Sequence, residues 1–221
     1  MRISHLGHAC LLVEARGRRV LIDPGAFSHD WHAIPDVDAV VVTHQHADHV
    51  DAAHLPALLS ASPRARVLVE GALHDDSSLL GLTAGDGRVE TLAPGDRVEL
   101  DGGIVLEGVG GRHAVIHEEI PRIGNVGVLV RAEGEPTLFH PGDAYEYAPD
   151  GVDVLAVPLA APWASFKETV AFARQVRPGA LVPVHDSVLS AQGRGVYLRQ
   201  LTALGGAQVR DLSGAGPTEM A

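Results

Sequence analysis

Residues 38–49 read Asp-Ala-Val-Val-Val-Thr-His-Gln-His-Ala-Asp-His. The first half is a short β-branched run, which predicts a strand over 38–43 that is buried on both faces. His44, His46, Asp48 and His49 follow at the end of that strand. Because the backbone leaves the pleat there, several side chains can point into one cleft. Imidazole nitrogens and a carboxylate are ligands for zinc and other first-row divalent metals, so the stretch predicts a metal site.

Further candidate ligands lie where later predicted strands end or turns begin. They are His113 after Gly110-Gly111-Arg112, Asp143 in His140-Pro141-Gly142-Asp143, and His185 after Val182-Pro183-Val184. A tetrahedral site with three protein ligands and a water cannot use them all, whereas two metals can. We therefore expect one metal on His44, His46 and His113, a second on Asp48, His49 and His185, and Asp143 as a bridge between the two.

The composition predicts a core built mainly from aliphatic side chains. The 221 residues are 46% hydrophobic but only 4% aromatic, and they include 25 glycines and 14 prolines. These numbers favour short strands joined by tight turns. One compact domain over 1–212 is expected from this length, followed by a loose C-terminal tail over 213–221.

Hydrophobic periodicity and turn signals place the elements along the chain. Strands are predicted over 2–6, 9–14, 18–22, 38–43, 67–70, 89–92, 97–100, 104–109, 126–132, 137–139, 152–158, 180–184 and 208–212. Helices are predicted over 52–60 after an Asp51 cap, 72–80, 166–176 after the capping box Ser165-Phe166-Lys167-Glu168, and 196–204. Helices alternate with strands at both ends around a β-rich middle. That order favours an α+β fold of two mixed sheets stacked face to face with helices outside.

Charge and local composition restrict the partners. The chain carries 17 basic and 28 acidic side chains, a formal charge of −11, which repels polyanions. Arg16, Arg18 and Arg19 form the densest basic group, in a predicted solvated turn, so no nucleic-acid partner is expected. No apolar run reaches the ~18 residues of a membrane span, the N-terminus lacks a secretion signal, and Cys10 has no disulfide partner. A cytoplasmic protein with a small-molecule substrate is expected, and a homo-oligomer is left open.

The motif His-x-His-x-Asp-His with a distant His, Asp and His resembles the metallo-β-lactamase fold superfamily over nearly the whole chain, from Gly7 to His185. The short segments Gly7-His8-Ala9, Leu21-Ile22-Asp23-Pro24, Gly124-Asn125-Val126-Gly127 and His140-Pro141-Gly142-Asp143-Ala144 resemble the branch that contains ascorbate-6-phosphate lactonase. The resemblance implies a four-layer αββα sandwich with two metals at one edge. It also implies the division of ligands expected above.

Two cations at about 3.5–4 Å would generate a bridging hydroxide near neutral pH and polarise the oxygen under attack. Asp48 is then both a ligand and a candidate proton acceptor. Asp23 could hold a ligand histidine by its second ring proton, although a plain Asp-Pro turn is an equal alternative, and His8 could act similarly. His117 and His140 either bind substrate or are structural. Tyr145 either donates a hydrogen bond to an oxyanion or packs at an interface.

These residues predict a metal-dependent hydrolase of a small polar ester or lactone. The alternatives are a phosphodiesterase acting on a small phosphodiester and a non-catalytic metal-binding module of the same fold. Histidine-rich ligation favours two Zn²⁺ ions, while the carboxylates and the lactonase resemblance leave Mn²⁺ or Fe²⁺ open.

Overall fold

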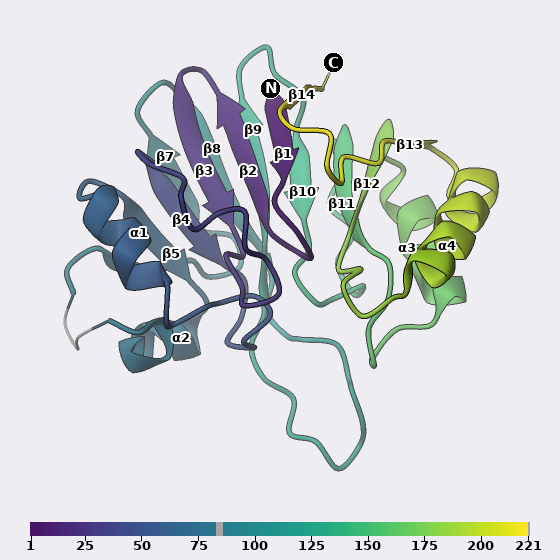
Figure 1. Ribbon diagram of the computed structural model, residues 1–221, viewed down its shortest axis with the longest axis horizontal. Coiled ribbons are helices and arrows are strands. Elements are labelled where there is room, and N and C mark those ends of the chain that lie inside the picture. Colours follow the sequence, from purple (N-terminus) through teal and green to yellow (C-terminus); the bar gives the residue numbers. More distant parts are fainter. Residues whose placement is uncertain (83–85, 221) are drawn as a thin grey trace.

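The computed structural model describes residues 1–82 and 86–220, which form two β-sheets stacked on each other (Figure 1). In spatial order, the first sheet contains β14 (Thr218–Glu219), β1 (Arg2–His5), β2 (Leu11–Ala15), β3 (Arg18–Ile22), β4 (Ala39–Val42), β5 (Arg66–Val69) and β6 (Val89–Thr91). The second contains β13 (Gln208–Val209), β12 (Ala180–Val184), β11 (Val154–Pro158), β10 (Leu138–His140), β9 (Val126–Ala132), β8 (Ile104–Gly110) and β7 (Arg97–Leu100).

Both sheets are mixed, and the connections explain why. In the first, β14 and β1–β3 pair antiparallel and β3–β6 pair parallel; in the second, β7–β10 pair antiparallel and β10–β13 parallel. The β2–β3 hairpin turns at Arg16 and Gly17, both with positive φ, as a tight two-residue turn requires. Parallel neighbours need longer crossovers, which irregular segments supply between β3 and β4 and between β10 and β11, and helices supply elsewhere. These helices are α1 (Leu55–Ala61), α2 (Gly71–Asp75) with the 3-10 helix η1 (Ser77–Leu80), α3 (Phe166–Val176) and α4 (Ala191–Leu204).

Alternating side chains divide the interior into three apolar layers. Leu11 and Val13 face the other sheet, whereas Leu12 of the same strand packs outward in the cluster that includes Leu55 and Leu58 of α1. On the second sheet, Leu155 and Val157 pack outward with Phe172 and Val176 of α3. Figure 1 shows α1 and α2 on one side and α3 and α4 on the other. The expected α+β, four-layer αββα sandwich is confirmed.

Two helices differ from the predictions at their starts, and the helix predicted over 72–80 is divided at Asp76 into α2 and η1. The Ser165 capping box is confirmed, since the Glu168 carboxylate accepts the Ser165 backbone N–H at 2.7 Å. The cap expected at Asp51 is wrong, because α1 begins at Leu55 with His54 as its N-cap. α4 begins five residues before the predicted 196, since the Ser190 hydroxyl caps the helix by accepting Gly193 N–H at 3.1 Å. No helix of the described residues is long and apolar enough to cross a membrane.

The loose tail expected over 213–221 is wrong for its described part, through residue 220. Strand β14 pairs antiparallel with β1, placing Thr218 opposite Ile3. Met220 donates its backbone N–H to Met1 O at 2.9 Å and is only 4% exposed, within the core between the sheets. The segment has no alternating apolar pattern of its own, so its order depends on the free edge that β1 offers.

Candidate metal centre

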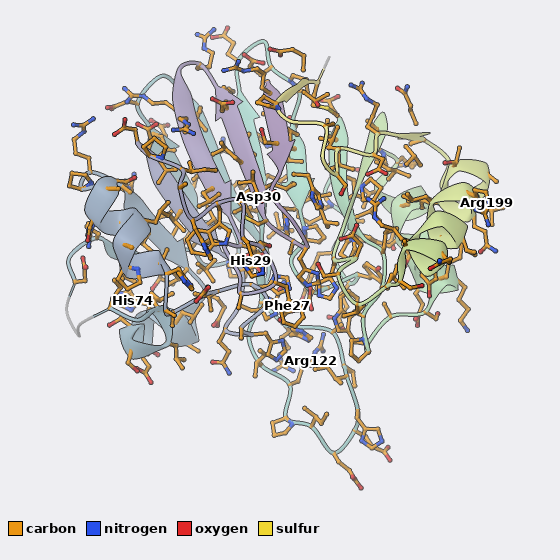
Figure 2. All side chains as sticks on the ribbon, in the orientation of Figure 1. Phe27, His29, Asp30, His74, Arg122 and Arg199 are labelled. Atoms are coloured by element: carbon orange, nitrogen blue, oxygen red, sulfur yellow. The ribbon has the colours of Figure 1, made fainter. Side chains whose placement is uncertain are left out.

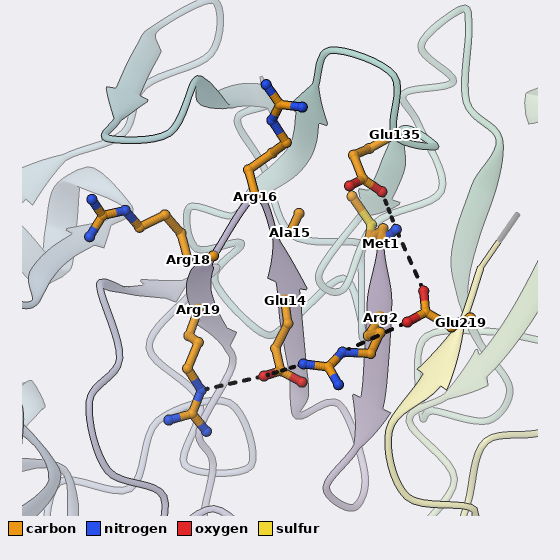
Figure 3. A pocket seen from close by; sticks show the side chains of 10 residues that line it. Met1, Arg2, Glu14, Ala15, Arg16, Arg18, Arg19, Glu135 and Glu219 are labelled. Carbon is orange, nitrogen blue, oxygen red and sulfur yellow. Dashed lines mark hydrogen bonds and ion pairs between the residues drawn. The ribbon is translucent and has the colours of Figure 1, made fainter.

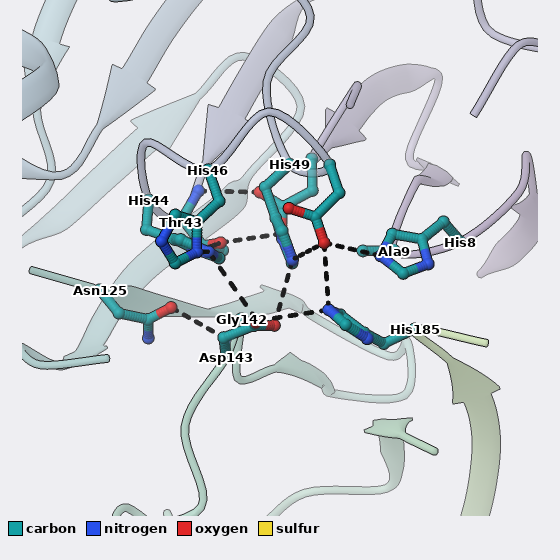
Figure 4. Close-up of polar contacts among 12 residues, drawn as sticks. His8, Ala9, Thr43, His44, His46, His49, Asn125, Gly142, Asp143 and His185 are labelled. Atoms are coloured by element: carbon teal, nitrogen blue, oxygen red, sulfur yellow. Dashed lines mark hydrogen bonds and ion pairs between the residues drawn. The ribbon is translucent and has the colours of Figure 1, made fainter. Parts of the chain in front are cut away.

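The predicted ligands converge at one end of the sandwich, beyond the carboxyl ends of the parallel strands. His44 to Asp51, here called the ligand loop, follow β4 directly. Asp143 follows β10 and His185 follows β12, while His113 lies on the long β8–β9 connection that projects from this end in Figure 1. Because parallel strands end at the same sheet edge, side chains far apart in sequence meet there. Figure 4 shows His44, His46, His49, Asp143 and His185 turned toward one another.

The structure brings together every predicted ligand, in two groups. His44, His46, His113 and Asp143 form one group, and His8, Asp48, His49 and His185 form the other. Each residue offers one possible ligand atom, and within each group these atoms lie within 4.8 Å of one another. The Asp143 carboxylate faces both groups, at 3.4 Å from His113 Nε2 and 3.1 Å from His49 Nε2. This position is the one that a bridging carboxylate requires.

Most of the central histidines are oriented by their second ring nitrogen. Nδ1 lies 3.0 Å from Thr43 Oγ1 in His44, 2.7 Å from Asp23 Oδ2 in His49, 2.7 Å from Ala114 O in His113 and 2.8 Å from Ala160 O in His185. A ring whose Nδ1–H donates to such an acceptor keeps its Nε2 lone pair free. The surrounding structure therefore selects the tautomer and ring orientation that metal binding needs.

The inner atoms of the centre fit divalent metal ions. His49 Nε2, His113 Nε2, His185 Nε2 and Asp143 Oδ1 are buried and have no well-formed hydrogen bond to any described residue. Buried polar atoms are normally paired, and unpaired ones are costly. Several imidazole and carboxylate donors gathered around the same space are the donor set of a zinc-type site. These residues could hold the two ions expected from the sequence.

The electrostatic field of the centre favours positive charge. Burial by itself would lower the pKa of His185, but the facing carboxylates of Asp143 and Asp48 outweigh it and raise this pKa to about 9. Burial also opposes the charged form of His49, yet Asp143 and Asp23 raise its pKa well above the usual value. Against the same burial penalty, the facing histidines hold the pKa of Asp143 well below its usual range. The carboxylates thus remain ionised and attract cations.

Asp23 contacts the residue that precedes the ligand loop and orients one of the histidines in the loop. It is fully buried, and it accepts hydrogen bonds from Thr43 N–H and the Thr43 hydroxyl, each at 2.8 Å, as well as from His49. Its φ of +48° is uncommon for a residue other than glycine, and such conformations gather at functional sites. A role in the Asp-Pro turn alone would not require the contacts of this carboxylate with Thr43 and His49. The geometry favours the interpretation that Asp23 positions a ligand histidine.

The segment after Asp23 also contacts the ligand loop closely. A Cβ atom on Gly25 would lie 1.8 Å from Asp48 O, so no other residue fits there without moving the backbone. Ala26 N–H donates to Ala47 O at 2.7 Å, and Asp51 N–H donates to Pro24 O at 2.9 Å. Backbone hydrogen bonds therefore fix the ligand loop at Ala47 and at Asp51.

His8 orients Asp48. Its Nδ1 accepts the Ser187 backbone N–H at 3.3 Å, so the ring proton belongs on Nε2, which lies 3.0 Å from Asp48 Oδ2. A protonated Nε2 donates to the carboxylate and is not free to bind a metal, which agrees with the supporting role expected for His8. Despite partial burial, His185 and His8 keep the pKa of Asp48 far below its usual value. The carboxylate is therefore ionised, which is the form that binds a metal ion.

Two of the three predicted substrate-binding residues are buried or partly buried and hydrogen-bonded within the fold, and the third is exposed. His140 is buried, with Nε2 2.9 Å from Ala9 O and Nδ1 accepting Gly142 N–H at 3.2 Å, so the structural interpretation is favoured. The Tyr145 hydroxyl donates to Pro158 O at 2.7 Å, and this favours packing over an oxyanion role. His117 is exposed on the β8–β9 connection, where its Nδ1 accepts Glu119 N–H at 3.2 Å.

Two side chains that hold Asp143 were not assigned a role from the sequence. Asn125 accepts the Asp143 backbone N–H at 2.9 Å and donates to Pro141 O at 2.9 Å. The Trp163 indole N–H donates to Asp143 Oδ2 at 2.8 Å. Asn125 stands in one of the segments that resemble the lactonase branch, which was an available signal. No sequence pattern marks Trp163, because the segment after β11 comes close to the centre only in the folded chain.

Replacing Trp163 with Phe should lower the apparent metal affinity by about tenfold, the lower end of the usual cost of losing a hydrogen bond to a ligand. Phe retains the ring contact with Tyr145, whose centroid lies 4.9 Å away, but it lacks the indole N–H. Competition with a chromogenic chelator measures the affinity. Tyr145→Phe is the matched control, since it removes a hydroxyl bonded to Pro158 and should leave the affinity unchanged. Equal affinity in Trp163→Phe and the wild type would contradict the positioning role.

The predicted arginine turn lies apart from the centre. Arg18 binds Asp38 at 2.9 Å, and Arg19 Nε lies 3.8 Å from Glu14. These arginines line a hollow of about 290 Å³ that Glu135 and Glu219 also border (Figure 3). Acidic partners therefore surround the basic group, and it offers no uniform positive surface to a polyanion.

Comparison with known proteins agrees with the geometry of the centre. The family described as Beta-lactamase superfamily domain matches residues 2–185. Protein Rv0786c of Mycobacterium tuberculosis is 40% identical over 205 residues, 92% of each chain. A UPF0173 metal-dependent hydrolase of Aeropyrum pernix is 28% identical over 149 residues, covering 64% of this chain and 61% of the relative. The fold matches that of Igni18, a metallo hydrolase from Ignicoccus hospitalis, with a TM-score of 0.73 at 19% identity and coverage of 100% and 99%. The chain belongs to the metallo-β-lactamase superfamily of metal-dependent hydrolases.

Proposed function

We propose that this protein hydrolyses a small ester or lactone at a dinuclear metal centre. The observation that carries the proposal is the pair of ligand groups that share Asp143. His44, His46 and His113 would hold one ion, Asp48, His49 and His185 the other, and Asp143 both. When bound, two divalent ions supply an activated water at neutral pH and polarise the oxygen under attack. Asp23, His8 and Trp163 keep the ligands oriented for that chemistry.

The surroundings of the centre support a neutral substrate. A hollow beside His46 and His113 is lined by Ala114, Ile116, Ile120, Pro121, Arg122 and Ile123. Arg122, the cation of this lining, is engaged by the Glu146 carboxylate and by the His113 carbonyl. Phe27, half exposed, lies beside the other ligand group, with its ring 5.3 Å from that of His8. The hollow measures only about 20 Å³, so it borders the centre and does not enclose a substrate. Its apolar walls, with their one cation already paired, favour a neutral acyl group over a phosphodiester anion beside the centre.

The decisive experiment is metal analysis of protein purified without added metal, combined with a hydrolase screen. We expect about two ions per chain and turnover of aryl esters or lactones that is lost on chelation and restored by Zn²⁺. Mn²⁺ and Fe²⁺ are tested in the same reconstitution, because the donor set accepts them. Turnover confined to bis(p-nitrophenyl) phosphate would replace the proposal with phosphodiester cleavage. Metal binding without turnover of any substrate would indicate a non-catalytic module.

A further inference from the structure

We propose a separate site for one divalent transition-metal ion at His32, Asp51 and His54, outside the dinuclear centre. One nitrogen or oxygen atom of each residue lies within 4.8 Å of the others. None of these residues belongs to either ligand group of the centre. Two imidazoles and one carboxylate are a common donor set for Zn²⁺, Ni²⁺, Co²⁺ or Cu²⁺, and water can complete the coordination.

Asp51 is the shared element of this trio. Its Oδ2 lies 2.7 Å from His54 Nδ1 and 3.7 Å from His32 Nε2, while its Oδ1 accepts Ala53 N–H at 2.9 Å. Metal–ligand distances of about 2.0–2.2 Å place neighbouring ligand atoms of a tetrahedral site roughly 3.3 Å apart. The two observed separations lie on either side of that value. A small turn of one imidazole would bring all three donors to a common ion.

Of the three side chains, His32 gives the clearest indication of a bound ion, because one of its ring nitrogens is buried without a partner in the described part of the chain. Its Nε2 is buried, and the nearest carboxylate among the described residues, that of Asp51, lies 3.7 Å away, too far for a well-formed hydrogen bond. The ring is held in place because Trp31 packs edge-on against it, with centroids 4.5 Å apart, and Trp31 itself is fully buried. An ion between His32 Nε2 and the Asp51 carboxylate would supply the partner that the buried nitrogen lacks.

His54 supplies the movable ligand. Its ring stacks on that of His32 with centroids 4.1 Å apart and planes 13° apart, so its Nδ1 must tilt to share an ion with His32 Nε2. The side chain is 53% exposed, so the turn meets little packing, and it exchanges the contact between Nδ1 and Asp51 Oδ2 for a shared ion. This exposure leaves coordination positions to water, and an ion here would exchange more readily than one in the buried centre. Both imidazoles face the Asp51 carboxylate.

An ion at this site would stabilise the end of the ligand loop. Asp51 closes that loop, its N–H is bonded to Pro24 O, and its backbone O accepts Leu55 N–H in the first turn of α1 at 2.9 Å. A ligand that binds only the folded chain raises its stability by mass action. Metal added beyond saturation of the centre should therefore raise the unfolding temperature further.

The test compares His32→Ala/His54→Ala with His29→Ala/His74→Ala. The control removes two histidines outside the trio: His74 lies on α2, and His29 is close to the trio, with its ring 5.7 Å from that of His32 (Figure 2). Each protein, stripped of metal, is titrated with Zn²⁺ against a chromogenic chelator. We expect the wild type and the control to bind about one ion per chain more than the His32/His54 variant. Equal stoichiometry in all three proteins would overturn the proposal.

A second measurement uses the wild type alone and does not depend on how the variant folds. Imidazole signals of His32 and His54 are followed by NMR while Ni²⁺ is added to protein whose centre is already filled with Zn²⁺. Selective broadening of both rings, with His74 unaffected, is the expected result. Their persistence at excess Ni²⁺ would refute the site. Because the comparison concerns ions beyond those in the centre, failure here leaves the proposed hydrolase function standing.

Discussion

Replacing His46 with Ala should remove the ion held by His44, His46 and His113 and lower turnover roughly a thousand-fold. The loss follows because a catalytic metal supplies several kcal/mol of transition-state stabilisation, at about 1.4 kcal/mol per tenfold in rate. Asp143→Ala should be more severe, since this carboxylate faces both ligand groups. We expect one ion per chain to be lost in the first variant and both in the second, measured by elemental analysis after dialysis.

His117→Ala is the matched control for these variants. His117 is an exposed histidine on the same connection as His113, but it belongs to neither ligand group. Its removal should leave the metal content unchanged. Wild-type metal content in His46→Ala or Asp143→Ala would end the ligand assignment. Loss of one ion in both variants would keep the centre but remove the bridging role of Asp143.

Replacing Asp23 with Ala should lower metal affinity by about 10–100-fold although Asp23 is not itself a predicted ligand. The change frees the His49 ring, whose Nδ1 lies 2.7 Å from the Asp23 carboxylate. It also leaves the buried Thr43 N–H and hydroxyl without their acceptor. Each such orphaned group costs about 1–3 kcal/mol, so the free energy of unfolding should fall by about 3 kcal/mol. Chemical denaturation and chelator competition measure the two effects.

Asp23→Asn separates stability from metal binding. Asn has the same shape, and its carbonyl oxygen can still accept Thr43 N–H, so part of the lost stability should return. Its amide N–H₂ then faces His49 Nδ1 and opposes the tautomer that leaves Nε2 free. We therefore expect metal affinity to stay low in this variant. Wild-type affinity in Asp23→Asn would show that Asp23 supports the fold alone.

Much of this molecule follows from local sequence. The β-branched run of β4 is buried on both faces, and the capping box at Ser165 starts α3 as predicted. The metal-type residues also follow from sequence, because His44, Asp143 and His185 all stand at strand ends. Strand ends are visible in a single sequence, since the apolar pattern stops there. The mixed sheets with outer helices are the arrangement that buries such strands and helices together.

The role of a residue could not be predicted from local sequence where it depends on a contact with a residue far away in the chain. Asp23 is a support and not a simple turn because the fold places it against Thr43 and His49, and Met220 is ordered because β1 offers it an edge. Trp163 reaches Asp143 through the path of β11, which no local pattern encodes. Periodicity, turns and caps are properties of neighbouring residues. Hydrogen bonds across the sandwich depend on the packing of both sheets, and they separate His140, which is structural, from His185, which faces the centre.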